Sequence, residues 1–310
     1  MELLKNNVLL TGSSGFLGKN ISQALEAQRM SKLIKLDKHH LRSDTLSLDL
    51  SESNPLAFLN VDTKISATIH LAAQSCVYVP EAEKESIIKH NLACFENAVK
   101  ITAKLGGKLL IHTSSSAVYG SINESSYKED FECKPLGAYG ESKLACETAS
   151  LQLEEDYGVK IVNFRLHNLI GNYQKASMLP HLIYENILNN APLELFGILS
   201  RSWTPVELLT KFFISLCNEA ENPKAVQNLK NVYNYGSKTS VTQIDLISLA
   251  QEITGGCCNY KLIDKRPFEM QSTLPNMKLF EDTFGSEYVP QDSSFLEQSM
   301  IRVLETFKKY

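Results

Sequence analysis

The fold is decided at NVLLTGSSGFLG, residues Asn7 to Gly18. A short apolar run ends at Thr11 and leads directly into glycines 12, 15 and 18, which have G-x-x-G-x-x-G spacing. Apolar residues then recur at helical spacing, at Leu17, Ile21, Ala24 and Leu25. A buried strand, a glycine turn and a helix in this order predict a site where backbone approaches a pyrophosphate at a helix N-terminus. The alternative is a glycine-rich turn that binds no ligand.

A second apolar run, Leu33 to Asp37 (LIKLD), ends in an acid 19 residues after Gly18. A carboxylate at this position can accept both ribose hydroxyls of adenosine and would repel a 2′-phosphate. We therefore expect NAD rather than NADP. Two alternatives remain. In one, Asp37 only starts a turn; in the other, the basic residues that follow bind a phosphate, namely Lys38, His39, His40 and Arg42.

A third motif is YGESK, Tyr139 to Lys143, with TSSSAVYG, Thr113 to Gly120, upstream of it. If residues 140–157 are helical, the tyrosine and the lysine project from one face and can converge on one ligand. Lowering a tyrosine pKa from ~10 by about three units needs roughly 4 kcal/mol, much of which a nearby lysine in a dry site could supply. Ser115 could offer its hydroxyl to the same substrate oxygen. The alternative is a solvated pair on a helix surface.

These motifs, together with Asp49-Leu50, HLAAQ (His70 to Gln74) and Asn91, resemble the extended short-chain dehydrogenase/reductase family in its nucleotide-sugar epimerase and dehydratase branch. The resemblance implies a nucleotide-sugar substrate and a catalytic set of Ser115, Tyr139 and Lys143. It implies that NAD is held by Gly12, Gly15, Phe16, Leu17, Gly18, Asp37, Asp49, Leu50, Leu71, Ala72, Ala73, Asn91, Tyr139 and Lys143. It implies substrate contacts from Ser115, Ser116, Asn168, Ser177, Arg201 and Arg266.

The second half of the chain follows the family pattern less closely. Arg165 to Gly171 (RLHNLIG) resembles the family's R-x-x-N-x-x-G segment, and Arg201 is a candidate for the diphosphate because a planar guanidinium suits phosphate oxygens. The loop before Arg201 is shorter than usual, and Ser202 and Leu208 replace aspartates. Phe268 stands where a glycine usually follows Arg266-Pro267. We expect Trp203 in the core rather than against a base.

Length and composition fit an α/β protein. With 310 residues, 43% of them hydrophobic, the chain can bury one large core and a smaller appendage. We predict a Rossmann-type doubly wound parallel sheet in residues 1–170 and a smaller, mixed α/β substrate lobe in 171–310, with some segments returning to the first domain. Strands are expected near 7–11, 32–37, 66–71, 108–114 and 159–165. Helices near 84–105 and 140–157 either cover their own sheet or, as the resemblance implies, pair with their copies in a homodimer.

Two later helices are predicted from their starts. Thr204-Pro205-Val206-Glu207 has the form of a capping box with proline at the first helical position, so a helix is expected from there through Leu216. Ser240 to Gln243 repeats the box, and Gly255 is placed to end that second helix.

Composition also argues against several classes of protein. The net charge of −4 provides no basic face for nucleic acid, and the apolar runs are far shorter than the ~20 residues of a membrane span. The seven cysteines show no C-x-x-C spacing, and no signal peptide or metal-binding cluster is apparent. We expect a cytoplasmic protein with no metal, nucleic-acid or membrane partner.

The type of reaction is narrowed by the residues after Ser115. The resembling dehydratases place an aspartate and a glutamate there, whereas Ser116 and Ala117 cannot act as acid or base at neutral pH. We therefore expect an NAD-dependent nucleotide-sugar 4-epimerase with Tyr139 as the base. The alternatives are a 4-keto-sugar nucleotide reductase that uses NAD(P)H and a non-catalytic dinucleotide-binding protein; the complete catalytic set argues against the latter. The sugar and its nucleotide are not identified.

Overall fold

The computed structural model describes residues 7–27, 33–39, 44–59, 61, 63–75, 79–121, 126–266, 270 and 272–308. Of the residues discussed above, His40, Arg42, Pro267 and Phe268 lie outside this part of the chain. The chain divides into two compact units. The first consists of Met1–Tyr119, Glu132–Arg165 and Thr210–Tyr233, and the second of Gly120–Phe131, Leu166–Leu209 and Asn234–Tyr310.

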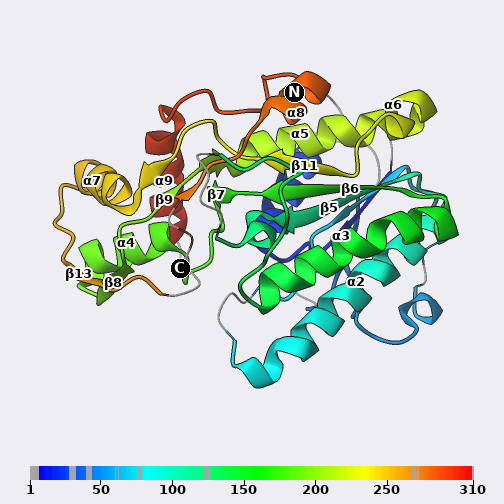
Figure 1. Ribbon diagram of the computed structural model, residues 1–310, viewed down its shortest axis with the longest axis horizontal. Coiled ribbons are helices and arrows are strands. Elements are labelled where there is room, and N and C mark those ends of the chain that lie inside the picture. The colour runs from blue at the N-terminus through cyan, green and yellow to red at the C-terminus, as the bar shows by residue number, and fades with distance from the viewer. Residues whose placement is uncertain are drawn as a thin grey trace. The chain divides into compact units, whose positions relative to one another are not determined.

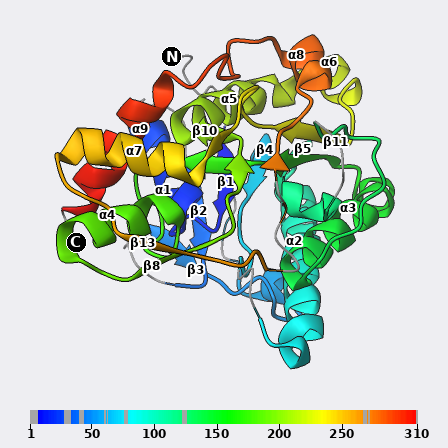
Figure 2. The same cartoon turned by 60° about the vertical axis from the view of Figure 1, so that its left-hand side comes forward.

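The first unit contains a seven-stranded sheet, apart from the last residues of two strands, Leu166 and Asn234–Tyr235, which are counted with the second unit. Its strands are β1 (Val8–Thr11), β2 (Leu33–Asp37), β3 (Thr45–Ser47), β4 (Ala67–His70), β5 (Leu109–Ser115), β6 (Lys160–Leu166) and β11 (Val232–Tyr235). They lie in the order β11-β6-β5-β4-β1-β2-β3. Figure 1 labels β11, β6 and β5 of this sheet, and Figure 2 labels β1 to β5. The pairings of β1 with β2 and β4, of β2 with β3 and of β4 with β5 are parallel. All five predicted strands are present, and the predicted α/β fold with a doubly wound parallel sheet is confirmed.

Helices connect and cover these strands. They are α1 (Phe16–Glu26), α2 (Lys84–Lys104), α3 (Ala138–Tyr157) and the short 3₁₀ turns η1 (Pro55–Ala57), η2 (Glu81–Glu83) and η3 (Ser116–Tyr119). The long helices α2 and α3 pack side by side (Figures 1 and 2). Alternate residues of the strands point to this helix layer, since a strand repeats every two residues.

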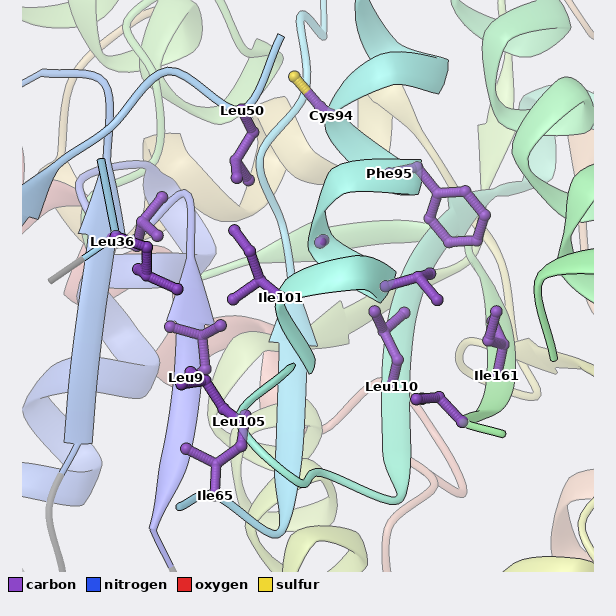
Figure 3. Close-up of a cluster of buried hydrophobic side chains, with 14 of the residues drawn as sticks. Leu9, Leu36, Leu50, Ile65, Cys94, Phe95, Ile101, Leu105, Leu110 and Ile161 are labelled. Atoms are coloured by element: carbon purple, nitrogen blue, oxygen red, sulfur yellow. The ribbon is translucent and has the colours of Figure 1, made fainter. Parts of the chain in front are cut away.

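The core between sheet and helices is apolar. Figure 3 shows Leu9 of β1, Leu36 of β2 and Leu110 of β5 gathered in one cluster with Ile101 of α2, and all four are almost fully buried. Burial of each such side chain stabilises the fold by about 1.5–3 kcal/mol. Polar residues are also buried on β5 and β6, namely His112 and Asn163, close to the site described below.

The second unit is mixed α/β. Its elements are β7 (Asn168–Ile170), α4 (Leu179–Asn189), β8 (Leu193–Phe196), β9 (Ser200–Arg201), β10 (Trp203–Pro205), β12 (Val241–Thr242), α7 (Gln243–Thr254), β13 (Tyr260–Ile263), β14 (Ser272–Thr273), α8 (Lys278–Phe284) and α9 (Phe295–Phe307). The strands form short sheets, in which β7 pairs with β10, β8 with β13, and β9 with β12 and β14. Trp203 is buried in the core of this unit, with Ile170, Tyr184 and Met300.

Both predicted capping boxes are wrong in position. Thr204 and Pro205 belong to β10, and helix α5 (Val206–Asn218) begins only after them, because β10 pairs with β7 and holds this backbone extended. The short segments η4 (Glu219–Glu221) and α6 (Pro223–Gln227) follow α5. Helix α7 is capped by Thr242, whose Oγ1 accepts a hydrogen bond from the Asp245 N–H at 3.2 Å. Gly255 ends α7 with a φ of +69°, as predicted.

The described part of the chain shows neither a membrane-spanning helix nor a metal-binding cluster. Across the described residues, no helix is long and apolar enough to cross a membrane. The same residues contain no group of three His, Cys, Asp or Glu side chains arranged to hold a metal ion.

Candidate active site

The glycine turn after β1 is shaped by two steric constraints. Gly12 has a φ of +68°, and a Cβ there would lie 2.7 Å from the backbone nitrogen of Ala72. A Cβ on Gly18 would lie 2.2 Å from the carbonyl oxygen of Gly12, so α1 could not pack this closely on the turn with any larger residue. Gly15, by contrast, is exposed and precedes the first residue of α1. The turn therefore presents open backbone at a helix N-terminus, where an anionic group is favoured.

Asp37 lies at the end of β2, next to this turn. One carboxylate oxygen accepts a hydrogen bond from the Ser14 N–H and the other from the His39 N–H, both at 2.9 Å. Ser13 Oγ, in the same turn, is buried and has no hydrogen-bond partner among the described residues. A glycine turn that needs the absence of Cβ atoms, an unsatisfied hydroxyl and an oriented acid fit a dinucleotide cofactor, with its pyrophosphate at the turn and its ribose at Asp37.

The predicted adenine side of the site includes Asp49 and Leu50. Burial acts to raise the pKa of Asp49, but hydrogen bonds from the Ser51 hydroxyl and N–H outweigh it, and the pKa is lowered. Leu50 is buried in the core, and its carbonyl accepts a hydrogen bond from Asn97 at 2.8 Å. Asp49 therefore remains an ionised acceptor.

The segment after β4 is held by side chains from two other elements. Thr11 Oγ1 accepts hydrogen bonds from the Leu71 and Ala72 N–H groups at 3.2 and 3.3 Å. The carboxamide of Asn91 on α2 contacts the backbone of Gln74 and the hydroxyl of Ser142 on α3. Asn91 thus fixes the position of the predicted cofactor-lining residues relative to the helix that carries Tyr139.

Tyr139 and Lys143 lie one turn apart at the beginning of α3. Lys143 Nζ is 5.8 Å from the centroid of the Tyr139 ring. Burial raises the pKa of Tyr139, while a hydrogen bond with Ser115 acts in the opposite direction; burial also lowers the pKa of Lys143. The lowered tyrosine pKa expected from the sequence is therefore wrong for this structure: the pKa of Tyr139 is raised, because burial outweighs the hydrogen bond with Ser115. Ser115 Oγ also accepts a hydrogen bond from the Ala117 N–H at 3.1 Å, which orients this hydroxyl.

A polar layer between α3 and the sheet supports these residues. Glu147, one turn after Lys143, accepts hydrogen bonds from Arg165 of β6 at 2.7 to 3.2 Å and from Ser114 of β5 at 2.5 Å. Both side chains of the ion pair are about 95% buried, and the pKa of Arg165 is raised, because the hydrogen bonds and charge of Glu147 outweigh desolvation. The Arg165 guanidinium also lies 4.7 Å from the Tyr119 ring centroid. Glu147 and Arg165 thus connect β5, α3 and β6 one helical turn after Lys143.

Sequence reasoning missed most of this layer. Besides Glu147, the structure brings His112 of β5, Ser150 of α3 and Asn163 of β6 into it. A signal was present, because His112 and Asn163 are polar residues inside otherwise apolar strand runs, and positions 147 and 150 follow Lys143 at helical spacing.

The predicted substrate residues of the second unit are Asn168, Ser177, Arg201 and Arg266. Asn168 begins β7 and pairs with Trp203, whereas Ser177 is exposed before α4. Arg201 Nη1 donates to the carbonyls of Ser200 and Met270, both at 2.9 Å. The Arg266 guanidinium lies over the Phe196 ring, 3.2 Å from its centroid.

Two UDP-sugar 4-epimerases resemble the chain along most of its length. UDP-glucuronate 4-epimerase 2 of Arabidopsis thaliana is 23% identical over 80% of this chain, which spans 64% of that relative's length. UDP-glucose 4-epimerase of Streptococcus mutans is 22% identical over 80% of this chain and 81% of its own length.

Solved structures share the fold. The UDP-N-acetylglucosamine 4-epimerase from Methanobrevibacter ruminantium M1 has a TM-score of 0.83 and 23% identity, covering 98% of this chain and 99% of its own. The UDP-glucuronic acid 4-epimerase from Bacillus cereus has a TM-score of 0.81 and 21% identity, with the same coverage. The model of the NAD dependent epimerase/dehydratase family matches residues 8–234. Family, enzyme class and NAD as cofactor are thereby confirmed as predicted, and the chain belongs to the NAD dependent epimerase/dehydratase family.

Proposed function

We propose that the protein is an NAD-dependent nucleotide-sugar 4-epimerase with Tyr139 as its base. The observation that carries this proposal is the arrangement of Tyr139 with Ser115 and Lys143, followed by Ser116 and Ala117 in η3. A dehydratase needs an acid and a base to eliminate water, and neither Ser116 nor Ala117 can supply one. The named relatives and structural neighbours that are sugar-nucleotide 4-epimerases support the same reaction.

In the proposed reaction, Tyr139 removes the proton of the C4 hydroxyl while Ser115 binds the same oxygen. NAD, held at the glycine turn and Asp37, would supply the acceptor and the donor for the hydride at C4, and the sugar would turn between the two transfers. Tyr139 then gives its proton back to the C4 oxygen. Lys143 places a positive charge beside the phenol, and Gly12, Asp37 and the residues around them hold the cofactor.

The same residues used once, in one direction, would make a 4-keto-sugar nucleotide reductase. The two reactions are separated by two measurements: the nucleotide released by denaturing the purified protein, and turnover with a panel of UDP- and dTDP-linked hexoses, hexuronic acids and N-acetylhexosamines. Stoichiometric NAD and interconversion of C4 epimers support the epimerase. Two results would contradict the epimerase. One is a protein that releases no nucleotide on denaturation and oxidises NADPH in the presence of a 4-keto sugar nucleotide. The other is elimination of water from the sugar.

We further propose that Arg201 and Arg266 bind the diphosphate, next to contacts from Asn168 and Ser177. Truncating an arginine that pairs with a buried phosphate costs about 2–5 kcal/mol. Arg201→Ala should therefore raise the Michaelis constant for the nucleotide sugar by roughly one to three decades and leave NAD content unchanged. Arg302→Ala, which removes a half-exposed arginine paired with Glu207, is the matched control. Equal Michaelis constants in the two variants would place the diphosphate elsewhere.

We also propose that α2 and α3 pair with their copies in a homodimer. Leu151 of α3 is 61% exposed, and a hollow of about 510 Å³ is lined by apolar atoms of Ile88, Leu144 and Ala145. Leu151→Glu should convert a dimer to a monomer in sedimentation experiments. Phe58→Glu, at an exposed apolar residue outside these helices, should not change the oligomeric state. A monomeric parent protein would contradict this proposal.

A further inference from the structure

His112 lies at the centre of the polar layer, on a strand where an apolar residue is expected. Its ring is 1% exposed and packs 4.6 Å from the Phe95 ring and 5.7 Å from the His70 ring, between centroids. Neither ring nitrogen is left without a partner. Nδ1 lies 2.8 Å from Asn163 Oδ1, and Nε2 lies 3.5 Å from Lys143 Nζ. A buried imidazole thus bridges β6 and the lysine of the catalytic set.

The hydrogen bonds around Asn163 decide which nitrogen of His112 carries the proton. Asn163 Nδ2 lies 3.0 Å from the carbonyl oxygen of Asn231, and that oxygen can only accept. This contact orients the carboxamide, so Oδ1 faces His112 and must accept from Nδ1–H. Burial and the nearby lysine lower the pKa of His112 well below its usual range, so the ring is neutral. Nε2 therefore presents a lone pair to Lys143.

The surroundings of Lys143 make this acceptor important. The ammonium is buried, and burial alone lowers its pKa. Glu147, the carboxylate whose charge acts on Lys143, is already paired with Arg165. Titratable and charged groups face Lys143 from β4, β5, α2 and α3: His70, His112, Cys94, Tyr139, Cys146 and Glu147. Among the described residues, His112 Nε2 is the hydrogen-bond acceptor that Lys143 Nζ contacts.

We propose that His112 is a positioning residue of this site: held in its Nδ1–H form by Asn163, it accepts a hydrogen bond from the Lys143 ammonium and keeps that lysine charged and beside Tyr139. The inference rests on the proposed function in assigning Lys143 to catalysis. A hydrogen bond to the charged form of a group favours that form, so loss of the bond lets Lys143 lose its proton at lower pH. Activity that requires the ammonium then declines at lower pH on the alkaline side.

Three variants separate this role from packing. His112→Phe keeps a ring of similar size but has no acceptor, whereas His112→Gln keeps an acceptor for Lys143 and a donor for Asn163. His70→Phe is the matched control, because His70 is an equally buried ring in the same cluster, bonded to Thr11 rather than to Lys143. Lys143 is titrated by NMR in protein containing ¹³Cε-labelled lysine, and its signal is assigned by its loss in Lys143→Met.

We expect His112→Phe to reduce the proton affinity of Lys143 about tenfold, a shift of about one pH unit, as one hydrogen bond to a charged group is lost. His112→Gln should restore most of the shift, and His70→Phe should leave the titration unchanged. The alkaline limb of the kcat profile should move with the NMR midpoint. Unchanged Lys143 titration in His112→Phe, or an equal shift in His70→Phe, would overturn the proposal.

One further variant keeps the test decisive. If His112→Phe does not fold, Asn163→Leu retains His112 but removes the group that holds its tautomer, and Lys143 should again titrate at lower pH; no shift there overturns the proposal. The NMR titration does not depend on turnover. Failure of the proposed 4-epimerase reaction is therefore seen in the sugar panel, and failure of the His112 contact in the Lys143 titration.

Discussion

The β1–α1–β2 region and the polar layer between α3 and the sheet carry two parts of the same site, but they are assembled differently. The first places its glycines and Asp37 within 26 consecutive residues, Gly12 to Asp37. The second brings together residues of β5, α3 and β6 and the backbone of Asn231. The glycine turn depends on the absence of side chains, whereas α3 depends on the pairing of buried polar ones.

The largest effect should come from Tyr139 on α3, the proposed base. Tyr139→Phe removes the proposed base, and general base catalysis typically contributes roughly 10²–10⁴-fold in rate. Turnover of the nucleotide sugar should fall by this factor, while NAD content and substrate affinity stay close to those of the parent. If the variant kept more than about half the activity, Tyr139 would not be the base, and the polar layer would have only a structural role.

Glu147→Gln tests the ion pair between Glu147 and Arg165 in the polar layer. It leaves the Arg165 guanidinium buried without a counter-charge, and breaking a buried ion pair costs about 3–5 kcal/mol. The free energy of unfolding in urea should drop by this order. Glu155→Gln, on the exposed side of α3, is the control and should change stability little. Equal stability of the two variants would mean that the layer contributes nothing to holding α3 in place.

Gly18→Ala tests the cofactor side by adding one methyl group. Its Cβ would lie 2.2 Å from the Gly12 carbonyl oxygen, which is backbone, so α1 must shift away from the turn. Overpacking of this kind costs about 1–3 kcal/mol. We expect purified protein with little NAD and a lower melting temperature that added NAD raises only weakly. Full NAD content would contradict the close packing of the turn.

Asp37→Ala should have the smallest effect. It removes an acceptor for the ribose hydroxyls and should weaken NAD binding by about tenfold, with a narrower gap between NAD and NADP. Asp37→Asn keeps one acceptor oxygen, so its affinity for NAD should lie between those of the parent protein and Asp37→Ala. Calorimetric titration of both cofactors measures the ratio; equal affinities in the parent protein would favour the basic residues after Asp37 instead.

Much of the fold could be read from the sequence, because its signals are local. The alternation of apolar strands and amphipathic helices, the glycine spacing before α1 and the tyrosine–lysine spacing on α3 each involve neighbouring residues. Trp203 as a core residue and Gly255 as a helix end were predicted in the same way. The capping box predicted at Thr204 is wrong because pairing of β10 with β7 determines the backbone conformation there. The local sequence pattern does not show which distant strand a segment pairs with.

The sequence by itself thus determined the family, the parallel sheet, the cofactor turn and the identity of the candidate catalytic residues. Only the tertiary structure decided how their ionisation is balanced. Burial raises the pKa of Tyr139 and lowers that of Lys143, while His112, from a strand that precedes Lys143 in the sequence, contacts this lysine and is itself bound by Asn163 of β6. The physical reason is that desolvation and hydrogen bonding depend on what surrounds a group in space. Spacing along the chain predicts which side chains share a helix face, but not which acceptor a buried ammonium finds across it.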